Sequence, residues 1–291
     1  MKRLLVSALL PLFLSSCMMV DLQWAQGNGV AVTEIRSLPA FERIDLQGPV
    51  HVIVKTGPSY SAFVTADENL TGYFQTDAFA GTLTICMAGG IQPSVEPEIT
   101  IVMPELRTLT HNGNALVEIQ EDGGFPDVNL TLNGSGTIFY SGTASTLTAT
   151  LNGSGTIEME GYASFLDARV RSNGELHGEN LLMGDADVEM SGSGLALLDL
   201  DYQSTLNLEL TGSGQVEWWG SPAWLNYHLD GIGKVVEHRG LPKKTAGAKI
   251  AAKQGAAGAA KRGATTGVTG MPSAGPYETV SGKGAGKNAA K

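Results

Sequence analysis

Charged side chains alternate with other residues at three places in this 291-residue sequence, and they are the first candidates for chemistry. Paired carboxylates beside a base or a cation are what the cleavage of a glycan requires. Alternating charges are also what the solvent-facing side of a β-strand produces. We therefore expect no catalytic site, and a carbohydrate-binding or carbohydrate-active protein remains the alternative. The pairs are Asp185 with Asp187, Asp199 with Asp201, and Arg169 with Arg171.

The sequence offers no evident ligand set for a metal ion and no motif for a cofactor. Its five histidines share no spacing such as His-x-x-x-His, which places two imidazoles on one side of a helix. The serines lie in predicted turns, without a matching histidine and aspartate. Cys86 belongs to the strand-like run Leu83–Met87, where a small, half-buried thiol is ordinary. We expect a protein without metal, cofactor or catalytic residues.

The N-terminus carries a motif with a defined chemical fate. Lys2 and Arg3 precede an apolar run, Leu4–Leu14, which is about 16 Å long as a helix and too short to span a bilayer. The next residues, Leu14-Ser15-Ser16-Cys17, resemble the bacterial lipobox. That resemblance implies cleavage before Cys17 and its acylation, so that acyl chains hold the protein on a membrane. By the same resemblance, Met18 in place of an aspartate favours the outer membrane, facing either the periplasm or the exterior.

Glycine is frequent, at 38 of 291 residues, and its positions are periodic. Seven short glycine-containing quartets end at residues 115, 136, 155, 174, 194, 214 and 233, so the step is 19 to 21 residues. This regularity indicates an internal repeat with one glycine-bearing corner in each unit. The predicted corner glycines are Gly134, Gly136, Gly153, Gly155, Gly174, Gly192, Gly194, Gly212, Gly214, Gly231 and Gly233.

Apolar residues keep the same step between the corners. In one unit they are Leu147, Ala149 and Leu151, and Ile157 returns to the apolar role two positions after Gly155. Such alternation buries one side of a β-strand and turns the intervening polar residues outward. The three offsets recur from Val128, Leu130 and Leu132 to Leu225, Tyr227 and Leu229.

A unit of about 20 residues cannot bury its own apolar row, but copies stacked on one another form a continuous core. We therefore predict an all-β fold, a single-stranded right-handed parallel β-helix (β-solenoid) with about 20 residues per coil. We expect the glycines to supply positive φ at sharp corners, Asn and Ser at the corners to bond their own backbone, and identical residues of adjacent coils to form ladders. A β-propeller lacks its signature residues, a calcium-binding nonapeptide solenoid has another period, and an antiparallel sandwich does not explain the repetition.

The region before the repeats adds a second signature. Residues 41–48 read Phe-Glu-Arg-Ile-Asp-Leu-Gln-Gly, and strand-like stretches follow at residues 83–85 and 99–104. Together with the Gly-Ser-Gly repeats, they make residues 32–240 resemble the head GIN domain family, exported β-solenoid proteins also labelled auto-transporter adhesins. The resemblance implies a bacterial envelope protein with an adhesive or scaffolding surface.

Composition changes after Gly240. Residues 241–291 contain nine Lys and Arg residues and one Glu, a net charge of +8 that leaves −18 on the rest of the chain. We predict that this basic segment, rich in Lys, Ala and Gly, is disordered, and that it is a candidate for binding an anionic envelope polymer rather than nucleic acid. The predicted organisation is a signal peptide at 1–16, a linker at 17–31, the solenoid at 32–240 and the disordered segment at 241–291.

Three tryptophans, Trp218, Trp219 and Trp224, cluster near the end of the repeats. By alternation from Val216, Trp218 points inward and Trp219 outward. We expect the cluster to close the last coil against water and against strand pairing. The alternative is that the indole of Trp219 stacks on a sugar ring.

Overall fold

The structure is a computed structural model that describes residues 24–121 and 124–238. The predicted signal peptide, Cys17 and the segment 241–291 lie outside the described residues. Within those ranges every regular element is a β-strand except the three-residue 3-10 helix η1 (Thr71–Tyr73). No helix there is long and apolar enough to cross a membrane.

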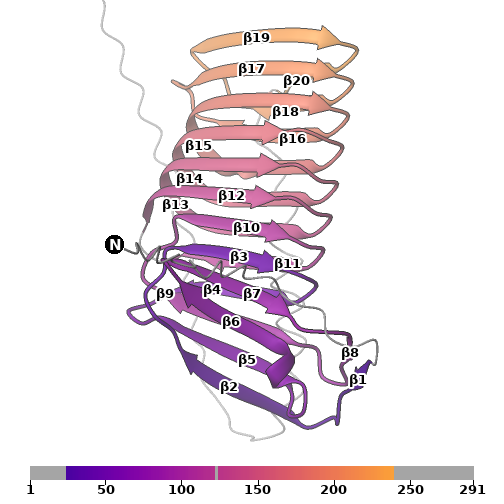
Figure 1. Cartoon of the computed structure of the whole chain (residues 1–291). Coiled ribbons are helices and arrows are strands. Elements are labelled where there is room, and N and C mark those ends of the chain that lie inside the picture. Colours follow the sequence, from indigo (N-terminus) through magenta and orange to yellow (C-terminus); the bar gives the residue numbers. More distant parts are fainter. Residues whose placement is uncertain (1–23, 122–123, 239–291) are drawn as a thin grey trace, which may run out of the picture. The chain divides into compact units, whose positions relative to one another are not determined.

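Parallel strands stack into two sheets, called here the A face and the B face, and one strand from each makes a coil (Figure 1). The predicted β-solenoid with about 20 residues per coil is confirmed. The A face consists of β7 (Thr82–Met87), β3 (Arg43–Gln47), β10 (Thr108–Asn112), β12 (Phe125–Leu132), the second halves of β13 (Thr137–Leu151), β14 (Thr156–Val170) and β15 (Glu175–Gly192), then β17 (Thr205–Gly212) and β19 (Trp224–Gly231). The B face consists of β9 (Glu98–Met103), β4 (His51–Thr56), β11 (Leu116–Gln120), the first halves of β13, β14 and β15, then β16 (Leu195–Leu200), β18 (Gln215–Trp219) and β20 (Lys234–His238).

The apolar rows predicted from the repeat lie in register inside the stack. Leu147 pairs with Leu166, and Leu166 with Ala186, so equivalent residues of successive coils stand above one another. All three side chains are fully buried. A single core therefore runs through the coils, which is why no unit can fold without its neighbours.

Antiparallel strands cover the N-terminal end of the solenoid. On the B face, β5 (Ser61–Asp67) pairs antiparallel with β9, and β2 (Ala31–Ser37) pairs antiparallel with β5. On the A face, β6 (Phe74–Phe79) pairs antiparallel with β7, and a separate two-residue parallel pair joins β1 (Ala25–Gln26) to β8 (Ile91–Gln92). Strands from both sides of the opening phrase at residues 41–48 thus close the core at this end.

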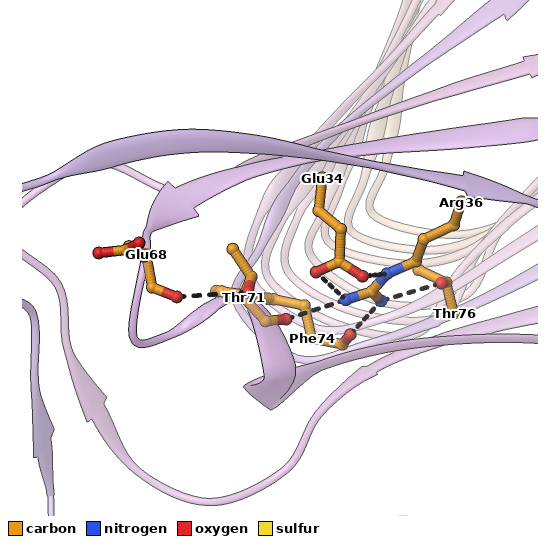
Figure 2. Close-up of polar contacts among 6 residues, drawn as sticks. All are labelled: Glu34, Arg36, Glu68, Thr71, Phe74 and Thr76. Atoms are coloured by element: carbon orange, nitrogen blue, oxygen red, sulfur yellow. Dashed lines mark hydrogen bonds and ion pairs between the residues drawn. The ribbon is translucent and has the colours of Figure 1, made fainter.

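The guanidinium of Arg36 links the two outermost strands of this cap (Figure 2). From β2 it donates to the Thr71 carbonyl at 3.0 Å, to the Thr76 hydroxyl at 3.1 Å and to the carbonyl of Phe74. Both carboxylate oxygens of Glu34 accept from it, and this contact lowers the pKa of Glu34. Because β6 follows η1, these bonds draw the edges of the A and B faces together.

The corner glycines form columns, but mostly for a reason other than the predicted one. Of the eleven, only Gly192, Gly212 and Gly231 have positive φ in the left-handed region, at 142°, 114° and 136°. A Cβ on Gly153 would instead lie 1.9 Å from the carbonyl oxygen of Gly134 in the preceding coil. The prediction of positive φ at every corner was wrong. At most of the other corners close contact with the backbone of the preceding coil excludes a side chain, and at Gly174, Gly214 and Gly233 the nearest atom belongs to a buried side chain.

One ladder of identical residues, as predicted for adjacent coils, is present beside these columns and is made of asparagines. Asn152 donates to Asn133 at 2.8 Å, Asn133 donates to Asn112 at 2.7 Å, and Asn112 donates to Asp45 at 2.8 Å. Each amide uses its NH₂ group toward one coil and its oxygen toward the next, so the ladder fixes the register at the corner.

The C-terminal end differs from the prediction. Trp218 points inward and is buried as expected, but another coil, β19 with β20, follows it. Leu225, Tyr227 and Leu229 were predicted to be buried, yet they are 39%, 58% and 43% exposed. Trp218 and Trp219 therefore do not close the last described coil, because no described strand covers the far side of β19 (Figure 1).

Candidate functional site

A polar groove with a volume of about 440 Å³ runs across the outside of the A face. It crosses β14, β15, β17 and β19, so four successive coils contribute to it. Its polar lining consists of Asp167, Arg169, Asp187, Glu189, Asn207, Glu209, Asn226 and His228.

Two columns of outward side chains build this groove. In the first, Asp167 pairs in register with Asp187, and Asn207 pairs with Asn226. In the second, Arg169 pairs with Glu189, and the column continues through Glu209 to His228 on β19. The alternation that buries the apolar row also turns both columns outward. The repeat therefore places side chains that are 20 residues apart in the sequence next to one another.

The groove residues bind one another. Arg169 donates to Asp167 at 2.6 Å, and its Nε lies 3.8 Å from a carboxylate oxygen of Glu189. On the neighbouring column, Asn207 donates to Asp187 at 2.7 Å and Asn226 donates to Asn207 at 2.9 Å. These bonds hold the polar groups in fixed positions, which reduces the entropy lost when a ligand binds.

Four carboxylates face a single guanidinium in the groove, so its charge is negative. The amide and carboxylate oxygens present an array of acceptors, and the Asn and Arg nitrogens present donors. This set suits recognition of hydroxyl, amide or ammonium groups. Among the residues that the structure describes, no cluster of three or more His, Cys, Asp and Glu side chains is arranged to hold a metal ion.

The charged pairs singled out in the sequence separate in space. Arg169 and Asp187 both line the groove, whereas Arg171 is exposed at a corner. The carboxylate of Asp185 accepts from the backbone N–H of Thr205 at 2.7 Å, and thereby ties β15 to the start of β17.

The other aspartate pair lies elsewhere. Asp199 is on β16 of the B face, and Asp201 accepts from the N–H of Tyr202 at 2.6 Å in the turn before β17. Glu189, Glu209 and Asn207 were not predicted as site residues. The repeat step itself carries the signal that could have found them, since each stands at the same offset in its unit as Arg169 or Asp187.

Trp219 lies on β18, on the B face, whereas the groove is on the A face. Its indole stacks on the imidazole of His238, with ring centroids 4.5 Å apart and planes 13° apart. One side of the indole is therefore covered by the protein itself. The exposed indole of this cluster is that of Trp224, which is 71% exposed at the start of β19.

The B face carries histidines paired with glutamates. His51 lies 3.1 Å from Glu118, and His177 lies between Glu175 at 3.0 Å and Glu179 at 3.3 Å. The hydrogen bond with Glu179, followed by that with Glu175, raises the pKa of His177 to about 9. His177 is thus a cation at neutral pH and compensates the buried carboxylate of Glu179.

Comparison with protein families identifies the chain. The family model described as "Putative auto-transporter adhesin, head GIN domain" matches residues 40–222. The chain belongs to this family. A separate search among curated proteins found no match.

Solved structures of low sequence identity share the fold. An adhesin described as "putative" from Bacteroides fragilis NCTC 9343 is 18% identical, with a TM-score of 0.67 over 73% of this chain and 99% of that one. A "putative lipid binding protein" from Parabacteroides distasonis ATCC 8503 is 20% identical, with a TM-score of 0.61 over 74% of this chain and 100% of that one. A "putative adhesin" from Parabacteroides merdae ATCC 43184 is 20% identical, with a TM-score of 0.60 over 74% and 98%.

Proposed function

We propose that this head GIN domain protein is a non-enzymatic, adhesion-type protein of the bacterial envelope, and that the A-face groove is its contact site. The observation that carries the proposal is the groove itself, a set of polar groups held on four stacked coils. The contacts of Arg169 with Asp167 and of Asn207 with Asp187 engage these groups with one another, which favours binding over reaction. The family's adhesin description supports the same role.

Adhesion through the groove can be tested with groove variants in a cell-binding assay. Beads that carry the full chain should bind intact bacterial cells, and Asp187→Ala with Asn207→Ala should lower that binding at least about tenfold, the usual effect of losing a central polar anchor. Asn133→Ala is the matched control, because Asn133 belongs to the corner ladder outside the groove. Equal binding by the groove variant and the control would remove the groove from the proposal.

A lipid anchor at Cys17 is the proposed route to the envelope, on the outer membrane. The lipobox-like residues 14–17 support it. Cys17→Ala should move the protein from the membrane fraction to the soluble fraction, because acyl chains supply the membrane affinity. Persistence of the variant in the membrane fraction would contradict the anchor. External protease applied to intact cells then decides between the surface and the periplasm.

The basic segment 241–291 is proposed as a second attachment, to an anionic envelope polymer. Its net charge of +8 supports this, and attraction of this kind weakens as salt screens it. Deletion of residues 241–291 should lower binding to purified envelope polymer at low salt. Unchanged binding would exclude the segment as an attachment.

Carbohydrate recognition is the second candidate function. The groove's volume falls in the range of about 300–1,000 Å³ that small-molecule sites occupy, and its amide and carboxylate groups can bind the hydroxyl groups of a sugar. A panel of envelope and extracellular glycans tests it, with the Asp187→Ala variant as comparison. Cleavage of a glycan that Arg169→Ala or Asp187→Ala abolishes would show an enzyme and would overturn the non-enzymatic proposal.

A further inference from the structure

The last described coil leaves an apolar strand edge open. β19 pairs with β17 on one side, and no strand among residues 24–121 and 124–238 pairs with its other side. The inward residues Leu225, Tyr227 and Leu229 are 39% to 58% exposed, whereas their register partners Leu206, Leu208 and Leu210 are at most 3% exposed. β19 covers Leu206, Leu208 and Leu210, and no described strand covers Leu225, Tyr227 and Leu229 in the same way. The exposed edge of β19 therefore has the composition of a contact between two coils.

The opposite end of the solenoid is built differently. There the outermost strand β2 carries Glu34 and Arg36, and Arg36 binds across to β6 and η1. Charged residues on an edge strand discourage pairing with another chain. β19 carries one charged residue, Asp230 near its C-terminal end, and no Lys, Arg or Glu, so the two ends do not match one another. Head-to-tail stacking of copies into a filament is disfavoured for this reason.

The five central residues of β19 match themselves by residue type when their order is reversed, whereas Trp224 and Asp230, which flank them, do not. The five residues read Leu225-Asn226-Tyr227-His228-Leu229. In an antiparallel pair centred on Tyr227, Leu225 of one copy faces Leu229 of the other, and Asn226 faces His228. The partners in each pair point to the same side, so apolar groups meet apolar groups inside and polar groups meet outside. A two-fold axis that passes between the two copies of Tyr227 relates these pairings to one another, so each pairing occurs twice.

We propose that two copies of this chain associate through β19, as a two-fold antiparallel strand pair centred on Tyr227. A second copy supplies the apolar row that β19 needs, whereas the chain's own residues 241–291 have a net charge of +8 and few apolar residues besides alanine. An eight-residue strand is about 26 Å long, so the contact is at the small end of stable interfaces and its Kd is on the order of micromolar. Association stops at two copies, because the open edge of each β19 is then paired with the other.

Association has a consequence for the groove. Asn226 and His228 belong both to β19 and to the groove lining. In the pair, His228 of the second copy lies beside Asn226, so the two grooves become one continuous surface across the two-fold axis. The pair itself does not depend on the proposed adhesive function, and the experiments below measure association alone.

Sedimentation velocity over about two decades of protein concentration tests the pair. The full chain carries Cys17→Ala throughout, so that acyl chains cannot drive association. We expect a monomer–dimer equilibrium, and at least tenfold weaker association for Leu225→Glu or Leu229→Lys alone. An equimolar mixture of these two variants should form a heterodimer, because the new carboxylate of one faces the new ammonium of the other. A full chain that stays monomeric throughout, or a mixture no tighter than either variant, overturns the proposal.

Cross-linking tests the register separately. Tyr227→Cys should give a disulfide-linked dimer on mild oxidation, because residues directly opposite in an antiparallel pair have Cβ atoms about 4.5–5.5 Å apart. Ile35→Cys is the matched control, since Ile35 is 68% exposed on β2 at the other end. Cross-linking of Tyr227→Cys at the rate of the control would overturn the proposed register. Both substitutions are at exposed positions, so the fold is expected to tolerate them.

Discussion

Substitution of Gly153 by alanine tests whether the corner glycines are required by contact between coils. A Cβ at this position would lie 1.9 Å from the carbonyl oxygen of Gly134, whereas real Cβ atoms essentially never come within 3.0 Å of a neighbour. The two coils must therefore separate by about 1.1 Å at this corner, roughly a quarter of the spacing between neighbouring strands. The obstacle is backbone on both sides, so no side-chain rotation relieves it.

The cost follows from the hydrogen bonds at the corner. Asn152 N–H donates to Leu132 O at 2.8 Å, Gly155 N–H to Gly134 O at 3.2 Å, and Thr156 N–H to Gly136 O at 3.0 Å. A separation of about 1.1 Å takes these bonds out of hydrogen-bonding range. At about 1 kcal/mol for each bond, Gly153→Ala should lower the free energy of unfolding by about 3 kcal/mol.

Urea unfolding followed by circular dichroism measures this loss. With a slope of about 2–3 kcal/mol per molar urea, the midpoint should fall by 1 M or more at an unchanged slope. Gly72→Ala is the matched control, because its Cβ would meet nothing within 4 Å and its φ is not in the left-handed region. The control should change stability by no more than about 0.5 kcal/mol. Equal effects of the two substitutions would refute the close-contact explanation of the glycine columns.

Three further predictions concern side chains. Glu179 and Glu175 raise the pKa of His177 to about 9, and Glu158 of β14 lies in register beside it, so the contribution of His177 to stability is present below pH 6.5 and is lost as pH rises through about 9. Urea unfolding at several pH values should show that His177→Gln removes about 1–2 kcal/mol of this pH dependence. An unaltered dependence of stability on pH would contradict the assigned pKa. Asn133→Ala breaks the corner ladder on both sides and should cost about 1–2 kcal/mol in urea unfolding; a cost below about 0.3 kcal/mol would show that the ladder adds nothing. Arg36→Met removes the donor to two carbonyls of the cap, so amide hydrogen exchange should accelerate across η1 and β6 but not in β14, and uniform acceleration would point to global destabilisation instead.

The repeat could be predicted from the sequence because parallel stacking repeats one environment in every coil. Leu147, Leu166 and Ala186 each meet the same neighbours above and below, so one period of about 20 residues specifies strands, register and core together. The asparagine ladder follows from the same periodicity, since Asn133 and Asn152 occupy equivalent positions.

The groove was only partly predictable. Arg169 and Asp187 were noted as members of alternating pairs along single strands, but each was paired in the sequence with a residue that does not line the groove. Their neighbours in space, Glu189 and Asn207, lie about 20 residues away along the chain and come together only through the register. The outward columns that line a groove are set by the shape of the stacked sheet, and no local sequence pattern indicates which columns these are.

Residue types and their period determined the β-solenoid, the buried rows and the family, because each is a property that every coil repeats. Tertiary structure alone showed how the two ends of the described solenoid differ. Antiparallel strands and Arg36 close one end, whereas no strand among the described residues covers β19 at the other, and most of the corner glycines are explained by contact between coils rather than by φ. The physical reason is that these features depend on distances between backbones that the period brings together but does not specify.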